Sequence, residues 1–294
     1  MAPLVGFSLQ PEQRFLELLD PVLREDVDVF EVAPETTWRR GADGGWEPND
    51  FWRAFAALGE ATGKPFVAHA VHGSLGTADP RDRSRQEQWL RRVAADHATF
   101  RFLWFTDHLG AAVLEGRAVA LPIALPMTDA MAEVVIGRLR TMQAVVPDVG
   151  LENTVTYFVL GAWLDEPDFF TRALALPRAH LLLDLHNVHT MALNLGADPR
   201  EYLRRLDADR VVEIHLSGGA CSQPQWLPNG RRLRLDSHDH AVPEAVWSLF
   251  EAILPRCRNL RCVTLERMEG TVEAADVATI RGELRRVREV LRGC

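Results

Sequence analysis

The chain has 294 residues, of which 47% are hydrophobic, and a net charge of −8 from 33 basic and 41 acidic residues. This length allows one large domain or two small ones, and a (β/α)8 barrel of ~250 residues fits within it. An acidic chain has no general electrostatic attraction to nucleic acid or to anionic membranes. The sequence shows no signal peptide and no apolar run near the ~20 residues that span a bilayer. We therefore expect a cytoplasmic protein without nucleic-acid or membrane partners.

Apolar runs of β-forming residues alternate along the chain with segments of helical periodicity. The expected strands are Leu4–Ser8, Val27–Ala33, Pro65–Val71, Phe100–His108, Val149–Asn153, Ala179–Asn187, Val211–Ser217 and Cys262–Glu266. The expected helices are Pro11–Arg24, Asn49–Thr62, Arg85–His97, Thr128–Val146, Glu166–Leu176, Pro199–Leu206, Pro243–Leu254 and Ala275–Leu291, with Asn49, Thr128 and Asp165 as N-caps.

Eight β-α units predict a parallel sheet that can close into a TIM barrel over residues 1–294 as a single domain. An open doubly wound sheet is the alternative, but no G-x-G-x-x-G motif follows the first strand. Two insertions, near residues 38–48 and 218–235, follow strand ends, and we expect them to lie over the active face as binding loops. The four cysteines form no CxxC pair and are expected to be reduced thiols.

Imidazoles and carboxylates recur at or near the C-terminal ends of the expected strands. In a TIM barrel these ends open onto one face, where active sites are built. A single histidine in such a place is more often a hydrogen-bonded core residue than a ligand, but independent core histidines would not all fall at strand ends. The set predicts a site for Zn, Fe or Mn. Its members are His69, His108, Glu152, His215 and Glu266.

Two further clusters add polar side chains to this face. Asp184 lies inside the expected strand Ala179–Asn187, where an unpaired carboxylate would cost several kcal/mol, so it needs a partner. By strand alternation it would share a face with His186. Asp236 and His238 form a D-x-H triplet that could clamp a metal ion, although a solvated turn is an equal alternative.

These segments together resemble the DUF692 family, also called multinuclear non-haem iron-dependent oxidative enzymes, which includes the iron subunits of methanobactin and thiaglutamate biosynthesis. The resemblance extends over nearly the whole chain and is most specific from Leu181 to Trp247, a stretch that contains Leu182-Leu-Asp-Leu-His-Asn-Val188, Glu213-Ile-His-Leu216 and Asp236-Ser-His-Asp-His240. It implies a xylose isomerase-like TIM barrel that oxidises a ribosomally made precursor peptide with O2, often at cysteine. It also implies two or three iron ions in a mixed Fe(II)/Fe(III) state and, in many members, a small partner protein that binds the leader peptide.

The resemblance also implies a ligand set. Asp184 matches an acidic position of the family and would be a ligand or an outer neighbour of the ligands. Asp239 and His240 are candidate catalytic residues because, following His238, they could shuttle protons. The implied ligands are His69, His108, Glu152, Asn187, His215, Asp236, His238 and Glu266.

The chain departs from the family pattern at four positions near the expected substrate pocket. One is Thr36, where asparagine often follows the acidic residue that is Glu35 here. His186 stands where the family usually has asparagine, Gly219 where it commonly has histidine, and His72 where glycine is common. These departures bear on the reaction subtype more than on the metal site.

Two rival functions remain compatible with the residues. A divalent-metal sugar isomerase or epimerase, or a phosphodiesterase-type hydrolase, would use a similar Glu/His/Asp set without O2. A non-catalytic scaffold would have kept the barrel and lost turnover, although the near-complete ligand set argues against it.

Overall fold

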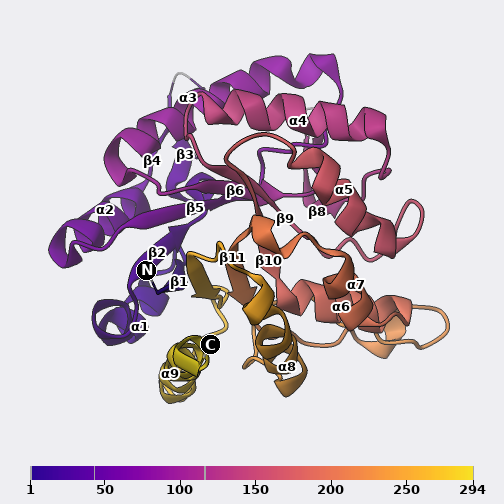
Figure 1. The fold of residues 1–294 in the computed structure, drawn as a ribbon. Coiled ribbons are helices and arrows are strands. Elements are labelled where there is room, and N and C mark those ends of the chain that lie inside the picture. The colour runs from indigo at the N-terminus through magenta and orange to yellow at the C-terminus, as the bar shows by residue number, and fades with distance from the viewer. Residues whose placement is uncertain (1, 43, 116, 294) are drawn as a thin grey trace.

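The computed structural model describes residues 2–42, 44–115 and 117–293. Eight parallel strands close into a barrel in the order β1-β12-β11-β10-β9-β6-β5-β2, and helices surround it (Figure 1). The TIM-barrel prediction is therefore confirmed. The barrel strands are β1 (Leu4–Leu9), β2 (Val29–Val32), β5 (Phe66–Ala70), β6 (Phe105–His108), β9 (Val149–Glu152), β10 (Ala179–Asp184), β11 (Val211–Leu216) and β12 (Cys262–Leu265).

Nine α-helices are found in the described part of the chain. Asn49 and Thr128 are N-caps as expected, because their side chains accept hydrogen bonds from the Trp52 and Met131 amides, whereas Asp165 makes no such bond. None of the helices is long and apolar enough to cross a membrane. They are α1 (Gln13–Glu25), α2 (Asp50–Thr62), α3 (Arg83–Phe100), α4 (Asp129–Gln143), α5 (Glu166–Ala173), α6 (Leu185–Leu195), α7 (Pro199–Arg205), α8 (Glu244–Ile253) and α9 (Asp276–Gly293).

Two of the expected strands extend into residues that are helical in the structure. The chain assigned to Phe100–His108 stays helical to Phe100, turns at Arg101 with φ of 51°, and forms β6 only from Phe105. The expected strand Ala179–Asn187 ends at Asp184, because the Asp184 side chain accepts a hydrogen bond from the Asn187 amide and starts α6. Asp184 is therefore not mid-strand, and His186 and Asn187 lie on a helix.

The insertions contain structure of their own. The one near residues 38–48 is an antiparallel hairpin of β3 (Trp38–Arg40) and β4 (Trp46–Pro48). The one near 218–235 holds a single 3-10 turn, Pro224–Trp226. A second hairpin between β6 and α4, formed by β7 (Ala111–Leu114) and β8 (Arg117–Ile123), was not predicted.

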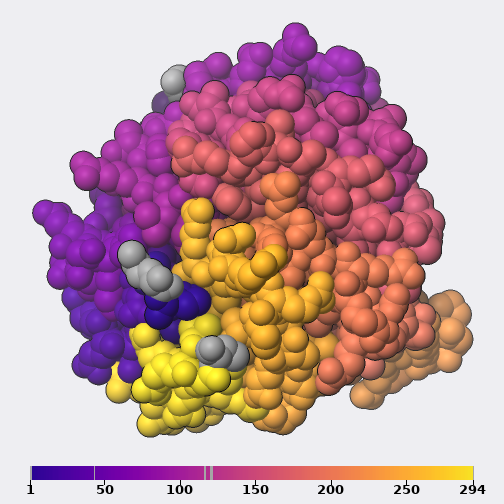
Figure 2. Space-filling model, viewed as in Figure 1, coloured from indigo at the N-terminus to yellow at the C-terminus, as the bar shows by residue number. Residues whose placement is uncertain are grey.

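The barrel closes where the two ends of the chain meet. β1 pairs with β2 on one side and with β12 on the other, and the first and last segments share one face of the molecule in Figure 2. Gly6 is required at this closure, since a Cβ there would lie 2.7 Å from the Thr264 hydroxyl.

A separate small apolar cluster fills the barrel interior. It contains Val29, Val67 and Cys262, which lie two residues before Glu31, His69 and Thr264 on their strands. Because side chains alternate along a strand, each pair faces the same side. The apolar cluster thus lies deeper in the barrel than the polar side chains at the C-terminal ends of the strands. Of the cysteines, Cys221, Cys257 and Cys262 are free thiols as expected, and Cys294 lies outside the described residues.

Candidate metal centre

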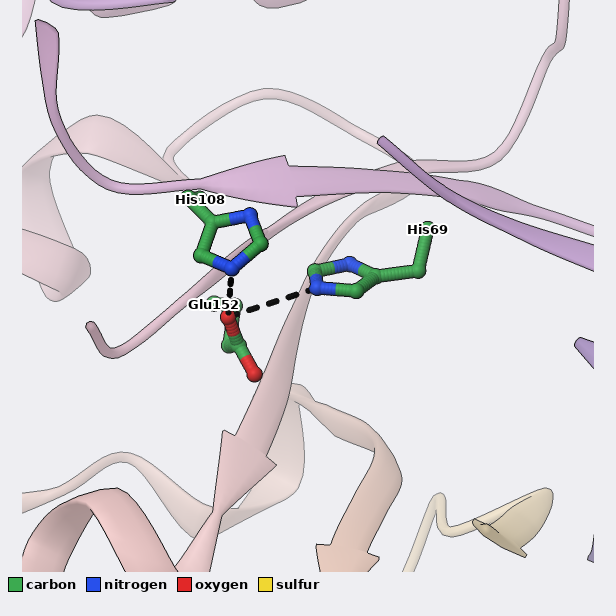
Figure 3. A group of neighbouring side chains, drawn as sticks. All are labelled: His69, His108 and Glu152. Carbon is green, nitrogen blue, oxygen red and sulfur yellow. Dashed lines mark ion pairs between the residues drawn. The ribbon is translucent and has the colours of Figure 1, made fainter. Parts of the chain in front are cut away.

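Two predicted histidine ligands converge on one oxygen of a third predicted ligand, Glu152, on a neighbouring strand. Glu152 Oε2 lies 3.1 Å from His108 Nε2 and 3.4 Å from His69 Nε2, and both rings are directed at it (Figure 3). The other ring nitrogens are held by the chain: His69 Nδ1 by the Thr106 hydroxyl at 3.0 Å and His108 Nδ1 by the Ala70 carbonyl at 2.9 Å. Such outer hydrogen bonds fix which nitrogen faces the site, as they do for metal-binding histidines.

The opposite side of the mouth is built from the end of β11, the loop between β11 and α8, and the end of β12. His215 Nδ1 lies 3.0 Å from Glu266 Oε2 and 3.5 Å from Glu152 Oε1. His238 Nδ1 lies 3.4 Å from the same Glu266 oxygen, and its Nε2 lies 2.7 Å from Asp236 Oδ1. His215 and Glu266 therefore link the two halves of the cluster.

The start of α6 places an acid and an amide between these halves. Asp184 uses Oδ1 to cap the helix, and Asn187 donates its side-chain N–H to the Asn153 carbonyl at 3.0 Å. This leaves Asp184 Oδ2 and Asn187 Oδ1 buried without a hydrogen bond to any described residue. His186, on the same helix, lies with Nδ1 3.3 Å from Asp236 Oδ1.

Several buried nitrogen and oxygen atoms in this cluster have no hydrogen-bond partner among the described residues. Such atoms cost free energy in a folded protein unless something not in the chain satisfies them. Among the described residues they include Glu152 Oε2, Asp184 Oδ2, Asn187 Oδ1, His215 Nδ1 and Glu266 Oε2. All five belong to predicted metal-site residues, and imidazole, carboxylate and amide donors suit a transition-metal cation.

The donor atoms form four overlapping groups of three, each with its atoms within 4.8 Å of one another. The first and last groups share no residue, whereas the middle groups share Glu152, His215, Asp184 or Glu266 with the others. The cluster could therefore hold more than one cation, with carboxylates between them. The groups are His69/His108/Glu152, Glu31/His215/Glu266, Glu152/Asp184/His215 and Asp184/His238/Glu266.

Electrostatics show an excess of acid in the cluster. Burial opposes charge on His69, but the contact with Glu152 and the negative charges of Glu152 and Glu31 together raise the pKa of His69 to about 9. The pKa of Asp184 is raised well above its ordinary value by burial and by the charges of Glu152 and Glu266. The positive charge of the imidazoles thus does not neutralise all the carboxylates of the cluster. A bound cation would neutralise the remaining negative charge.

Glu31 was not among the predicted site residues. Its Oε2 lies 2.8 Å from His215 Nε2 inside the barrel, so it orients the ring whose Nδ1 faces the cluster. Glu213 is two residues before His215 on β11 and lies on the same face, with Oε1 3.8 Å from Nε2. The signal for Glu31 was available, because a carboxylate in the apolar strand Val29–Val32 needs a buried partner.

The two candidate catalytic residues are not brought into the cluster. The His240 side chain is 60% exposed, with Nδ1 2.6 Å from Asp239 Oδ1. Asp239 also accepts a hydrogen bond from the Ser237 hydroxyl. Their proton-shuttle role stays a prediction.

Two of the four departures from the family pattern, Gly219 and His186, lie next to each other. A Cβ on Gly219 would lie 2.9 Å from His186 Cε1 and 2.2 Å from the Leu235 carbonyl oxygen. The His186 ring therefore takes the space beside the missing side chain of residue 219. His72 stands apart from them at the end of β5, where its amide donates to Glu35 Oε1 at 3.0 Å.

Solved structures share this architecture at low sequence identity. D-psicose 3-epimerase from Clostridium cellulolyticum H10 superposes with a TM-score of 0.61 over 99% of both chains at 12% identity. A xylose isomerase domain protein from Planctomyces limnophilus superposes with a TM-score of 0.57 over 100% of this chain and 97% of its own at 16% identity. These likenesses establish the xylose isomerase-like barrel.

The sequence relatives define the family. A UPF0276 protein from Rhizorhabdus wittichii is 34% identical over 254 residues, which cover 86% of this chain and 84% of that protein. Residues 5–292 match the family described as RiPP precursor modification enzyme MbnB/TglH/ChrH, in which RiPP denotes a ribosomally made, modified peptide. The chain therefore belongs to the MbnB/TglH/ChrH family of RiPP precursor modification enzymes.

Proposed function

We propose that the chain is a multinuclear iron-dependent enzyme that uses O2 to oxidise a residue, often cysteine, of a ribosomally made precursor peptide. The family supplies the peptide substrate. The observation that carries the metal assignment is the convergence of buried ligand atoms on Glu152, Asp184, Asn187, His215 and Glu266, none of which makes a hydrogen bond to a described residue. Glu152 and Glu266 each contact His215 as an ion pair. Bound iron would supply the means to bind O2 and to take up electrons from the substrate.

The overlapping groups suggest how the ions divide. His69, His108 and Glu152 would hold one ion, and Asp184, His238 and Glu266 a second. His215, between Glu152 and Glu266, would complete either site or hold a third ion with them. Asn187 and Asp236 would add oxygen ligands beside the second ion.

Exposure indicates the side from which a peptide would approach. The side chains of His108, His238 and Asp236 are 19%, 13% and 15% exposed, whereas that of His215 is fully buried. The substrate side chain would enter past the first three. His215, held by Glu31, would keep the inner wall of the site rigid and dry.

The test is elemental analysis of the protein purified without oxygen, for the wild type and the His108→Ala variant. We expect two or three irons per wild-type chain and fewer in the variant, with a parallel loss of peptide-dependent O2 consumption. His97→Ala is the control, since His97 lies on α3 outside the cluster.

Zinc or manganese with negligible iron, persisting after expression in iron-supplemented medium, would overturn the oxidative assignment and favour an isomerase or hydrolase. Full iron and full activity in His108→Ala would overturn the ligand assignment. A small leader-binding partner stays a prediction of the family resemblance.

A further inference from the structure

The β3–β4 hairpin is fixed against α3 by the buried indole of Trp38. Asp96 of α3 accepts hydrogen bonds from Trp38 Nε1 at 2.6 Å and from Trp52 Nε1 of α2 at 2.8 Å. Figure 1 shows β3 and β4 beside α2 and α3. The hairpin therefore has a fixed position on α3 and could form one side of a ligand-binding cleft.

A cavity of about 610 Å³ separates this wall from the end of the barrel. Its lining includes Trp38, Trp46 and Trp89, together with Glu35 and His72. Glu35 follows β2 and His72 follows β5, so the cavity lies at the barrel end that carries Glu31 and His69. Its volume falls in the ~300–1,000 Å³ range of ligand pockets.

A second hollow of about 480 Å³ continues outward over α3 and is lined by Arg91 and Arg92. Trp46 and Gln88 line both hollows, so the two meet at the Trp46 ring. The Arg40 guanidinium stacks on that ring, 3.8 Å from its centre. We call the two hollows together the Trp46 cleft.

The cleft has a cationic side in an acidic protein. Arg85 and Arg92 are neutralised by Asp82 and Asp96. Arg40 and Arg91 make no ion pair with any described residue, although both lie in the cleft lining. A ligand with a carboxylate would meet the guanidinium groups of Arg40 and Arg91 there.

The inner end has a different character. Glu35 Oε1 accepts hydrogen bonds from the His72 amide and the Trp89 indole, while its Oε2 is buried without a partner among the described residues. Around it the lining is aromatic and aliphatic, with Val71 and Val113. This end suits a peptide residue with an apolar or aromatic side chain. The backbone N–H of that residue could donate to Glu35.

We propose that the Trp46 cleft binds the precursor peptide beside the residue that enters the metal centre. The inner hollow takes an apolar or aromatic side chain, and Arg40 and Arg91 take an acidic one further along the peptide. The substrate class is therefore an acidic, aromatic-containing segment near the modified residue. This inference rests on the proposed function for its peptide, and it concerns recognition, not the oxidation.

The experiment is selection of random twelve-residue peptides with one fixed cysteine on the metal-loaded protein, without oxygen. Enriched peptides are then measured by fluorescence anisotropy against wild type, Arg91→Glu, Trp46→Ala and the control Arg140→Glu. Arg140 is an exposed arginine in the last turn of α4. Thermal unfolding of each variant verifies that it is folded.

We expect the selected peptides to carry Asp or Glu at a constant spacing from the cysteine. Their binding should weaken at least about tenfold in Arg91→Glu and Trp46→Ala and remain unchanged in Arg140→Glu. Replacing the selected acid by lysine should restore binding to Arg91→Glu.

Peptides that bind all four proteins equally would overturn the cleft, as would a selection that enriches nothing. Because binding is read without oxygen, these outcomes are independent of whether iron oxidises the peptide. Conversely, failure of the iron assignment would leave the binding result intact.

Discussion

His215 and Glu31 meet across the interior of the barrel, with Nε2 and Oε2 2.8 Å apart. Their strands, β11 and β2, are separated in the barrel by β12 and β1. The contact leaves Nδ1 of His215 facing Glu152 and Glu266. One carboxylate therefore determines how a fully buried imidazole of the cluster is oriented.

Glu31→Gln should weaken metal binding without removing a ligand. The amide replaces a charged acceptor of the His215 ring, and loss of such an outer partner lowers metal affinity ~10–100-fold. Competition with a chelator under anaerobic conditions measures it. Glu47→Gln, which changes a surface carboxylate paired with Arg39, is the control, and equal affinities in both variants would contradict this role for Glu31.

Asp184 should show two separable roles. Asn is as good an N-cap as Asp, so Asp184→Asn should lose metal while the metal-free protein keeps its stability. Asp184→Ala loses the cap of α6 as well and should cost ~1 kcal/mol more in unfolding free energy. Denaturant unfolding of the metal-free proteins and metal analysis separate the effects. Equal stability of the two variants would argue against the cap.

Glu166 should make the stability depend on pH away from the cluster. Burial, opposed by hydrogen bonds from Tyr202 and Trp163, raises its pKa from 4.5 to about 7. The folded state therefore holds a proton that the unfolded state releases, and stability falls as pH rises from about 4.5 through about 7.

Glu166→Gln should remove this dependence. The variant should gain up to ~3 kcal/mol on the wild type between pH 5 and 8. Urea unfolding of both proteins across that range measures the difference. A difference that does not change with pH would contradict the raised pKa.

Gly219→Ala should disturb the loop that carries Asp236 and His238. Its Cβ would lie 2.2 Å from the Leu235 carbonyl oxygen, so the backbone next to Asp236 must move, at a cost of ~1–3 kcal/mol. We expect a lower melting temperature and lower metal content. Gly137→Ala on α4, where a Cβ meets nothing within 4 Å, is the control and should be neutral or stabilising. Matching behaviour of the two would show that the space beside His186 is not restrictive.

The barrel and most of the site followed from local signals. Apolar runs identified the eight strands, and the rule that parallel strand ends share a face brought His69, His108 and Glu152 together. Helix α6 was missed because Leu181-Leu-Leu-Asp-Leu continues as an apolar, strand-like run. Only the hydrogen bond from the Asn187 amide to Asp184 marks its end, and that bond is not visible in composition.

The role of Glu31 and the exposure of His240 depend on contacts in three dimensions, which the hydrophobic periodicity of the sequence does not predict. Glu31 becomes part of the site because its side chain and that of His215, on β2 and β11, meet inside the barrel. Asp239 and His240 were chosen for their closeness to His238 in sequence. His238 has φ of 50°, and the chain beyond it leads to an exposed His240.

The pairing of β1 with β12 has a consequence for the order in which the protein matures. Leu4 cannot find its partner Cys262 until nearly the whole chain has been synthesised, and such distant pairing is slow to form. Glu266 follows that last strand directly. A nascent chain could assemble the His69, His108 and Glu152 group early, but the half that needs Glu266 forms only after closure. We therefore expect the complete set of candidate ligands to come together only after synthesis.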